Sequence, residues 1–378
     1  GILAFLPGES EIRRVIGALD SLPSNVEVLP LYGSLPFRDQ QRALGPVTGR
    51  KLVLATSIAE TSLTIPDIRV VVDGGRARRA RYDPGSGMSR LVTERVSRAE
   101  ADQRRGRAGR VAEGTCYRLW TKGEEGGLAA FPPAEIETAD LAGLALDLAE
   151  WGSDDLAFLT PPPAGALGEA KALLTALGAL KDGHITDHGR ALARMPLHPR
   201  LAHMMALSGE AAAPLAALLA DRDPMRGVGC DLGLRLARLK SNIREPGLDR
   251  IRAEARRLQK SATKTEISDA AEQAALAFPD RIGLRRSGDD PRWLLSGGKG
   301  AKMEAADPLA GERLLVVTDT DGHPREAVIR TALPISEAAL RDVMGDQIAD
   351  VKTVEWSRRE GRVIARIEER LGAIALSS

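Results

Sequence analysis

The residues best suited to chemistry form one short stretch, the sequence QRRGRAGR at positions 103–110. It offers several guanidinium groups from one turn and helix start, and each stays charged and can bind an anion through two hydrogen bonds. Such groups suit the charge that develops on a phosphoryl group during its transfer. The two glycines allow close approach of the backbone. The stretch therefore predicts a phosphate-binding site.

A second stretch, ATSIAETSLTI at positions 55–65, follows an apolar, strand-like run at 51–54. Its hydroxyl groups and backbone amides would lie at the end of a strand, where α/β sheets bind their ligands. Either stretch alone could be a surface loop, and Arg-Gly runs are common in disordered RNA-binding tails. Both together, in this order and spacing, favour a functional site.

The elements that must position these stretches alternate between short apolar runs, such as 2–6 and 70–73, and helical spacing, such as 9–19 and 37–44. This alternation predicts a parallel α/β sheet over residues 1–125. Beyond it the pattern changes three times. Residues 126–195 read as helix, helix, short β-wing and helix, the order of a winged helix. Residues 196–285 read as a helical bundle. Residues 286–378 read as short strands at 293–295, 313–317 and 326–329, one embedded helix at 336–344 and a hairpin at 351–367. This pattern suits a five-stranded OB barrel. The expected fold class is therefore multidomain.

Charge is unevenly distributed along the chain. The formal net charge is +1, yet Arg76 to Arg110 contains eleven arginines against four acids, which predicts a phosphate or nucleic-acid partner. A solvated basic face is the alternative. The two cysteines, Cys116 and Cys230, have no metal spacing and fit a reducing cytoplasm. No run of eighteen apolar residues is present, so no membrane span is expected, and the five histidines suggest no metal site.

Several stretches resemble the DEAH-box class of superfamily 2 RNA helicases. Residues 55–65 and 103–110 look like motifs V and VI of that class, FLPGESEI at 5–12 looks like motif IV, and LYGSLP at 31–36 with QQR at 40–42 looks like motif IVa. The Arg-rich insert around Tyr82-Asp83-Pro84 resembles the β-hairpin that these enzymes carry between motifs V and VI. The stretches 293–300 and 354–356 resemble the bacterial branch called HrpB.

The resemblance implies roles for individual residues. It implies that Gln103 faces the γ-phosphate and attacking water, and that Arg107 and Arg110 are arginine fingers. In the nucleic-acid track, it implies that Thr61, with Ser57 on the same loop, contacts the RNA backbone. The backbone amide of Gly8 would face an RNA phosphate, and Arg38 is assigned to the same track. For Arg104 and Arg105, a salt bridge and a phosphate contact are equally open.

The sequence departs from the family pattern at three places. Ser57 replaces the usual motif V asparagine. Asp67 follows Pro66, where many members have an acid near the ribose, and it either reaches the ribose or caps a turn; we favour the turn. Leu44 stands where eukaryotic members stack an aromatic ring on adenine, and a core position is equally open for it.

The phosphate loop GxxxxGK[ST] and the sequence Asp-Glu-Ala-His are both missing from the 378 residues. Since residues 2–6 already read as a buried strand, we expect this chain to be cut from a longer protein whose first RecA-like lobe precedes Gly1. That lobe would supply the Mg²⁺ ligands for ATP, and this chain alone should not hydrolyse ATP. The expected partner is single-stranded RNA, with DNA also open, and the expected state is a cytoplasmic monomer. The alternatives are a non-enzymatic nucleic-acid-binding scaffold and a domain whose Arg-rich hairpin binds an acidic protein.

Overall fold

The chain forms two units in this computed structural model, which describes residues 1–20, 22–60, 64–83, 88–225, 227–260, 262, 267–323, 325–357 and 361–377. Unit 1 comprises Gly1–Arg81 and Leu91–Thr138, and unit 2 comprises Tyr82–Arg90 and Ala139–Ser378.

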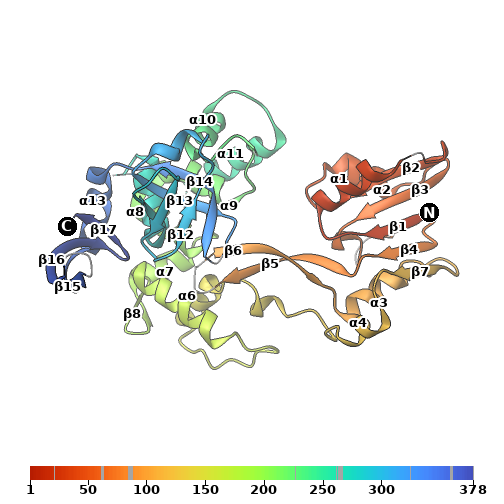
Figure 1. The fold of residues 1–378 in the computed structure, drawn as a ribbon, viewed down its shortest axis with the longest axis horizontal. Coiled ribbons are helices and arrows are strands. Elements are labelled where there is room, and N and C mark those ends of the chain that lie inside the picture. Colours follow the sequence, from red (N-terminus) through yellow and green to blue (C-terminus); the bar gives the residue numbers. More distant parts are fainter. Residues whose placement is uncertain are drawn as a thin grey trace. The chain divides into compact units, whose positions relative to one another are not determined.

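A five-stranded parallel sheet organises unit 1, with the spatial order β2-β3-β1-β4-β7 (Figure 1). Apolar residues of its central strands, including Leu3, Val53 and Val71, are fully buried. Helices serve as the crossovers that parallel strands require. The predicted parallel α/β lobe is confirmed. Its elements are β1 (Ile2–Phe5), α1 (Glu9–Ala18), β2 (Val26–Leu31), α2 (Phe37–Leu44), β3 (Arg50–Ala55), β4 (Val70–Asp73), α3 (Arg98–Gly106), β7 (Thr115–Arg118) and α4 (Lys122–Gly126).

The Arg-rich insert forms the expected hairpin, with strands β5 (Arg76–Asp83) and β6 (Met88–Arg95). Its arms belong to unit 1, whereas Tyr82–Arg90 belongs to unit 2. In unit 2, Met88 is buried in the core of a β-barrel beside Trp293 and Val317. Its sulfur also accepts a hydrogen bond from Thr320 Oγ1 at 3.0 Å. Pro84 lies outside the described residues.

Unit 2 continues with the predicted succession of helix, helix, short hairpin and helix. The hairpin pairs Leu180 with Ile185 in antiparallel register. The side chain of Thr186 caps the following helix by accepting a hydrogen bond from the Gly189 amide. The elements are α5 (Ala142–Trp151), α6 (Ala164–Ala176), β8 (Leu180–Lys181), β9 (His184–Ile185) and α7 (Asp187–Ala193).

Helices dominate the next part of unit 2 and share one apolar core that includes Met204, Leu215 and Leu248. Residues 199–220 form a helical stretch long and apolar enough to cross a membrane by length and composition. Within it, a window of 18 residues is 67% buried inside the protein, so most of this stretch belongs to the core of unit 2. The helices are α8 (Pro199–Ser208), α9 (Ala213–Ala220), α10 (Leu232–Lys240), α11 (Pro246–Gln259) and α12 (Ala270–Ala277).

A closed five-stranded barrel follows, with the order β10-β11-β12-β14-β13. The predicted five-stranded barrel is confirmed, but its composition differs from the prediction. The barrel ends at Pro334, so the helix and the 351–367 hairpin come after it and are not part of it. The barrel is closed instead by β10 and β12, two strands that the apolar pattern did not predict. Its strands are β10 (Ile282–Arg285), β11 (Arg292–Leu295), β12 (Gly300–Lys302), β13 (Leu314–Thr320) and β14 (Glu326–Pro334).

The last elements are α13 (Glu337–Met344) and a separate three-stranded antiparallel sheet. That sheet consists of β15 (Ile348–Ser357), β16 (Arg362–Leu371) and β17 (Ile374–Ser377). Its base packs on the helical core through Leu371 and Ile374.

Candidate functional site

The turn that follows α3 presents the predicted phosphate-binding residues. Helix α3 begins with a capping box, in which the Ser97 side chain and the Glu100 side chain each bond the other's backbone amide. The helix ends at Gly106, and the chain then turns through 107–109. Gln103 and Arg110 are exposed, and Arg107 is half-buried. The fold thus places Gln103 and Arg110 on the surface of unit 1, where a ligand can reach them, with Arg107 beside them.

Two like charges meet at this turn. Burial lowers the pKa of the Arg107 guanidinium, and repulsion from Arg110 lowers it further. Arg107 is held in place because its Nη2 donates to the backbone carbonyl of Glu60. Two guanidinium groups near enough to repel each other are stabilised by an anion that binds both. The chemistry of this turn therefore suits a phosphoryl group.

Arg104 lies beneath the turn and is not available to a ligand. Its side chain is fully buried, and its Nη1 donates to Asp73 Oδ1 at 2.8 Å. Its Nε donates to Glu60 Oε1 at 2.7 Å. The guanidinium also lies 4.8 Å from the ring centroid of Phe5. Burial alone would lower the pKa of Arg104, but attraction by Asp73 and Glu60 outweighs it and leaves that pKa raised. The geometry therefore favours the salt-bridge alternative.

Arg105, in contrast to Arg104, lies on the surface, where its side chain is 62% exposed. It forms a loose ion pair with Asp102, with 3.4 Å between Nη2 and Oδ1. An exposed pair of this kind contributes little to stability.

The carboxyl ends of three neighbouring strands bring other predicted residues to the same edge of the sheet. Phe5 at the end of β1 is in register with Ala55 of β3 and with Asp73 of β4. Gly8 therefore follows one strand end, and Ser57 follows the next at the start of a short 3₁₀ turn, where it is exposed. This edge is where α/β sheets bind ligands. Thr61, assigned to the same loop, lies outside the described residues.

Gly8 is buried beneath an arginine of the hairpin. A Cβ atom built at Gly8 would lie 2.6 Å from Arg78 Nη1 and 3.0 Å from Glu11 Oε2. Arg78 Nη2 in turn donates to both carboxylate oxygens of Glu11 at 3.1 Å. The start of α1 therefore already carries a guanidinium, which would approach any phosphate that binds there.

The remaining predicted residues have simpler surroundings. Leu44 is half-buried and packs on the core of unit 1, which favours its core alternative. Asp67 is exposed in a turn with a φ of 66°, in agreement with the preferred turn. Arg38 is exposed in the first turn of α2.

The hairpin is less basic than its arginine count suggests, because acids from other segments neutralise many of its charges. Glu11 and Glu124, for example, lie outside the stretch from Arg76 to Arg110. This pairing reduces the free charge on which the acidic-partner hypothesis depends. The arginines of the stretch that form ion pairs are Arg78, Arg79, Arg81, Arg95, Arg104 and Arg105.

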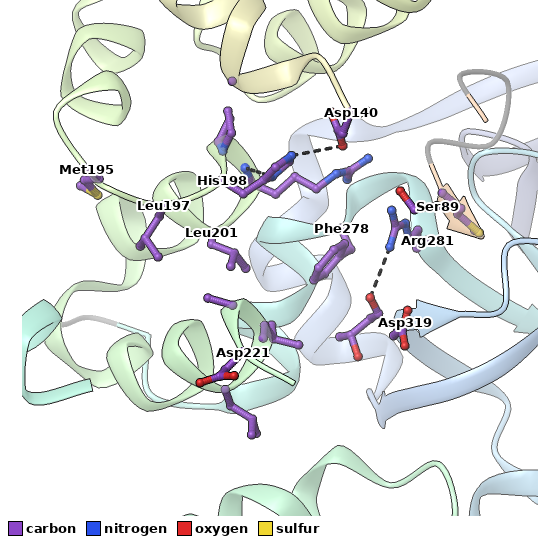
Figure 2. Close-up of a pocket in the computed structure, with 18 of the residues that line it drawn as sticks. Ser89, Asp140, Met195, Leu197, His198, Leu201, Asp221, Phe278, Arg281 and Asp319 are labelled. Carbon is purple, nitrogen blue, oxygen red and sulfur yellow. Dashed lines mark hydrogen bonds and ion pairs between the residues drawn. The ribbon is translucent and has the colours of Figure 1, made fainter. Parts of the chain in front are cut away.

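A cavity of about 780 Å³ lies inside unit 2 (Figure 2). His198 Nε2 and Asp140 Oδ2, both on its wall, lie 3.3 Å apart and form a hydrogen bond. Arg281 donates to the Thr318 carbonyl at 3.3 Å. Burial, with repulsion from Arg200, lowers the pKa of Arg281 to about 10. Carboxylates outnumber guanidiniums along the wall, so the cavity does not suit a chain of phosphates. The charged lining residues are Asp140, Asp147, Asp221, Asp223, Asp319, Arg200, Arg235 and Arg281.

Sequence reasoning missed Glu60 and Asp73, which hold Arg104 and Arg107 in place. A signal was present for Asp73, because it is the last residue of an apolar β-branched run and so occupies a strand end. Glu60 lies within the 55–65 stretch, but no local signal showed its role, since its partner Arg104 is 44 residues away. Within the described parts of the chain, no group of three His, Cys, Asp or Glu residues is arranged to hold a metal ion.

Two family models match the chain. The helicase conserved C-terminal domain matches residues 2–112, and the helicase-associated HA2 winged-helix domain matches residues 172–197. The first match includes strands β1 to β4 of the sheet, the hairpin and the turn at 107–110, but not β7. The second covers only the later part of the helix–helix–hairpin–helix succession.

Curated relatives extend the similarity to the whole chain. ATP-dependent RNA helicase HrpB of Escherichia coli is 37% identical over 99% of this chain and 47% of that protein. The splicing factor prp22 of Schizosaccharomyces pombe, also named an ATP-dependent RNA helicase, is 40% identical over 55% of this chain and 19% of its own length. The crystal structure of the E. coli DExH-box NTPase HrpB matches with a TM-score of 0.87 and 36% identity, covering all of this chain and 47% of that one. The chain thus spans about half the length of HrpB.

Proposed function

Because this chain belongs to the DEAH-box helicases and resembles HrpB along its whole length, we propose that it is the C-terminal part of an ATP-dependent RNA helicase. The observation that carries the proposal is the pair of mutually repelling guanidiniums, Arg107 and Arg110, on a turn anchored to Glu60. In the proposed mechanism both stabilise charge on the γ-phosphoryl group of ATP. Gln103, which is exposed on α3, holds the attacking water.

ATP hydrolysis needs groups that this chain does not offer. Its sequence has no GxxxxGK[ST] loop and no Asp-Glu-Ala-His, the stretches that hold the phosphates and Mg²⁺ in enzymes of this class. We propose that another RecA-like lobe of the whole protein cradles the phosphates, binds Mg²⁺ and activates water. On this proposal the 378-residue chain has no ATPase activity of its own.

The RNA track is proposed to begin at the strand-end edge of unit 1, with Gly8, Ser57 and Thr61, and to include Arg38. Contacts of this kind grip the backbone and carry little sequence preference. The cavity in unit 2 is proposed to receive bases, because its acid-rich wall disfavours phosphates. Single-stranded DNA offers the same phosphates and bases, so we include it as a second substrate.

The finer architecture is part of the same proposal. We assign residues 1–125 to the second RecA-like lobe, 126–195 to a winged helix, 196–285 to a helical bundle and 286–378 to an OB-like β domain. The whole protein is proposed to act as a monomer in the cytoplasm, where the two free cysteines would remain reduced.

The decisive experiment compares two arginine variants of the full-length protein. Arg110→Ala should lower the RNA-stimulated ATPase rate by roughly a thousandfold, as loss of an arginine finger does. Arg105→Ala is the matched control, because Arg105 lies in the same stretch but is exposed and only loosely paired, so its rate should remain within about twofold of wild type. Equal rates in both variants would reject the finger assignment and favour the scaffold alternative.

A further inference from the structure

The C-terminal sheet continues beyond its third strand as a two-stranded ribbon. Strands β15 and β16 pair along their whole lengths, whereas β17 pairs only with Glu369, Arg370 and Leu371. We call residues 351–357 and 362–367 the C-terminal ribbon. A ribbon of two strands buries little apolar surface by itself and is only marginally stable in water. Its composition is therefore informative about what covers it.

One face of the C-terminal ribbon is apolar and exposed. The register places Trp356 opposite Val363, and Val354 opposite Ala365. Residues directly opposite each other in an antiparallel pair share a face, so these side chains form one patch. Trp356 is 63% exposed and Val354 is 71% exposed. Ile367, which is opposite Lys352, extends the patch toward the base of the sheet and is 56% exposed. A contiguous exposed patch of this kind marks an interaction surface.

The charge of the C-terminal ribbon selects the class of partner. Residues 351–367, including the connecting loop, contain five basic residues (Lys352, Arg358, Arg359, Arg362, Arg366) and two acidic ones (Glu355, Glu360), a net charge of +3. Glu368, next to this segment, pairs with Arg366 at 3.2 Å and reduces that excess to +2. Lys352 shares the apolar face, opposite Ile367. A second copy of the ribbon would bring two positive surfaces together, which is unfavourable. A polyanion that also carries flat apolar groups would match the positive charge of the ribbon and cover its apolar patch.

We propose that the C-terminal ribbon is an accessory single-stranded RNA-binding surface. A base stacks on the exposed ring of Trp356, sugars pack on Val354 and Val363, and phosphates approach Lys352. This is the combination of aromatic platform and positive charge that binds single strands without reading their sequence. The inference rests on the proposed function for its choice of RNA as the polyanion. It adds a contact on the last sheet of unit 2, separate from the strand-end edge of unit 1.

The test measures binding of fluorescent oligouridylate to the full-length protein and its Trp356→Ala variant. Loss of one stacking platform should weaken binding by about tenfold, and Trp356→Phe should restore most of it. Trp151→Ala is the matched control, because Trp151 is 75% exposed at the end of α5, outside the ribbon, and its affinity should equal that of wild type. Circular dichroism and thermal melting of each variant establish that the fold is retained.

Two further readouts separate this proposal from the proposed function. In the ATPase assay, Trp356→Ala should raise the RNA concentration for half-maximal stimulation and leave the maximal rate unchanged. RNA-stimulated turnover that is identical in wild type and Trp356→Ala, with equal RNA affinity, overturns the ribbon proposal and leaves the helicase proposal intact. If RNA does not stimulate ATP turnover by wild type, but Trp356→Ala binds RNA about tenfold more weakly, the helicase proposal is overturned and the ribbon proposal stands. The ribbon proposal is also overturned if Trp356 is needed for a dimer or a protein complex while RNA affinity is unchanged in Trp356→Ala.

Discussion

Arg104 and Glu60 form an ion pair enclosed in unit 1, with the arginine side chain fully buried and the glutamate side chain 9% exposed. The pair joins the start of the loop after β3 to the helix that carries the candidate catalytic turn. Glu60 also receives Arg107 on its backbone carbonyl. Glu60 thus supports both the buried Arg104 and the half-buried Arg107.

Arg104→Ala should therefore destabilise unit 1 by about 3–5 kcal/mol, because it leaves two buried carboxylates without their cation. Urea unfolding of the 378-residue chain, followed by circular dichroism, measures this change. Arg105→Ala, in the next position but exposed, should change the free energy of unfolding by no more than about 0.5 kcal/mol. A similar small change in both variants would contradict the assignment of Arg104 as the anchor.

Gly8→Ala should weaken RNA binding with little effect on stability. The φ of Gly8 is −164°, an extended conformation that alanine also adopts, so the new methyl group mainly displaces the flexible guanidinium of Arg78. Because the Arg78–Glu11 pair is partly exposed, its loss should cost less than about 1 kcal/mol. We expect a several-fold loss of RNA affinity in a fluorescence titration.

Gly17→Ala provides the control for that experiment. Gly17 lies in α1, and a Cβ atom there would meet nothing within 4 Å. Alanine should stabilise the helix slightly and leave RNA affinity unchanged. If both glycine variants bind RNA as wild type does, the assignment of the start of α1 to the RNA track is wrong.

The His188–His203 pair should make unit 2 less stable in mild acid. Nε2 of His188 lies 2.8 Å from Nδ1 of His203. Burial, together with repulsion from His188, lowers the pKa of His203 to about 4, from 6.5 in the unfolded chain. The unfolded chain therefore binds more protons between those values, and stability is lost as pH falls from about 6.5 to about 4.

The measurement is the free energy of unfolding at pH 7 and pH 5 for wild type and His203→Gln. We expect the wild type to lose about 1–2 kcal/mol more than the variant. His184→Gln, at an exposed position of β9, should behave as wild type does. A pH dependence that is unchanged in His203→Gln would show that the pair does not titrate as proposed.

Much of unit 1 could be predicted because its strands and helices have strong local patterns. The run at 70–73 and the helical spacing at 37–44 match β4 and α2 residue for residue. The barrel was harder, because β12 (Gly300–Lys302) has three residues and no alternation. Its strand character comes from pairing with β11 and β14, and this tertiary context leaves no local signal in the sequence.

The candidate site, like the fold, was only partly predictable from local sequence. The arginines of the 103–110 stretch were evident from residue type and spacing. The burial of Arg104 and the exposure of Arg105 were not evident, because burial depends on which face of α3 packs against the sheet. The neutralisation of Arg78 by Glu11 joins residues 67 apart in sequence. Pairings over such separations are set by the fold and cannot be read from local charge.

The placement of Met88 in the barrel core also constrains how the protein is made. Its hydrogen-bond partner Thr320 is 232 residues further along the chain, and Gly322, with a φ of 69°, leaves no room for a side chain against the Ser89 carbonyl. During synthesis at roughly 5–20 residues per second, the hairpin tip would wait about 10–50 s for these partners to leave the ribosome. Until then an apolar side chain at the tip has no native core to enter. This interval is when the nascent chain would depend most on chaperones.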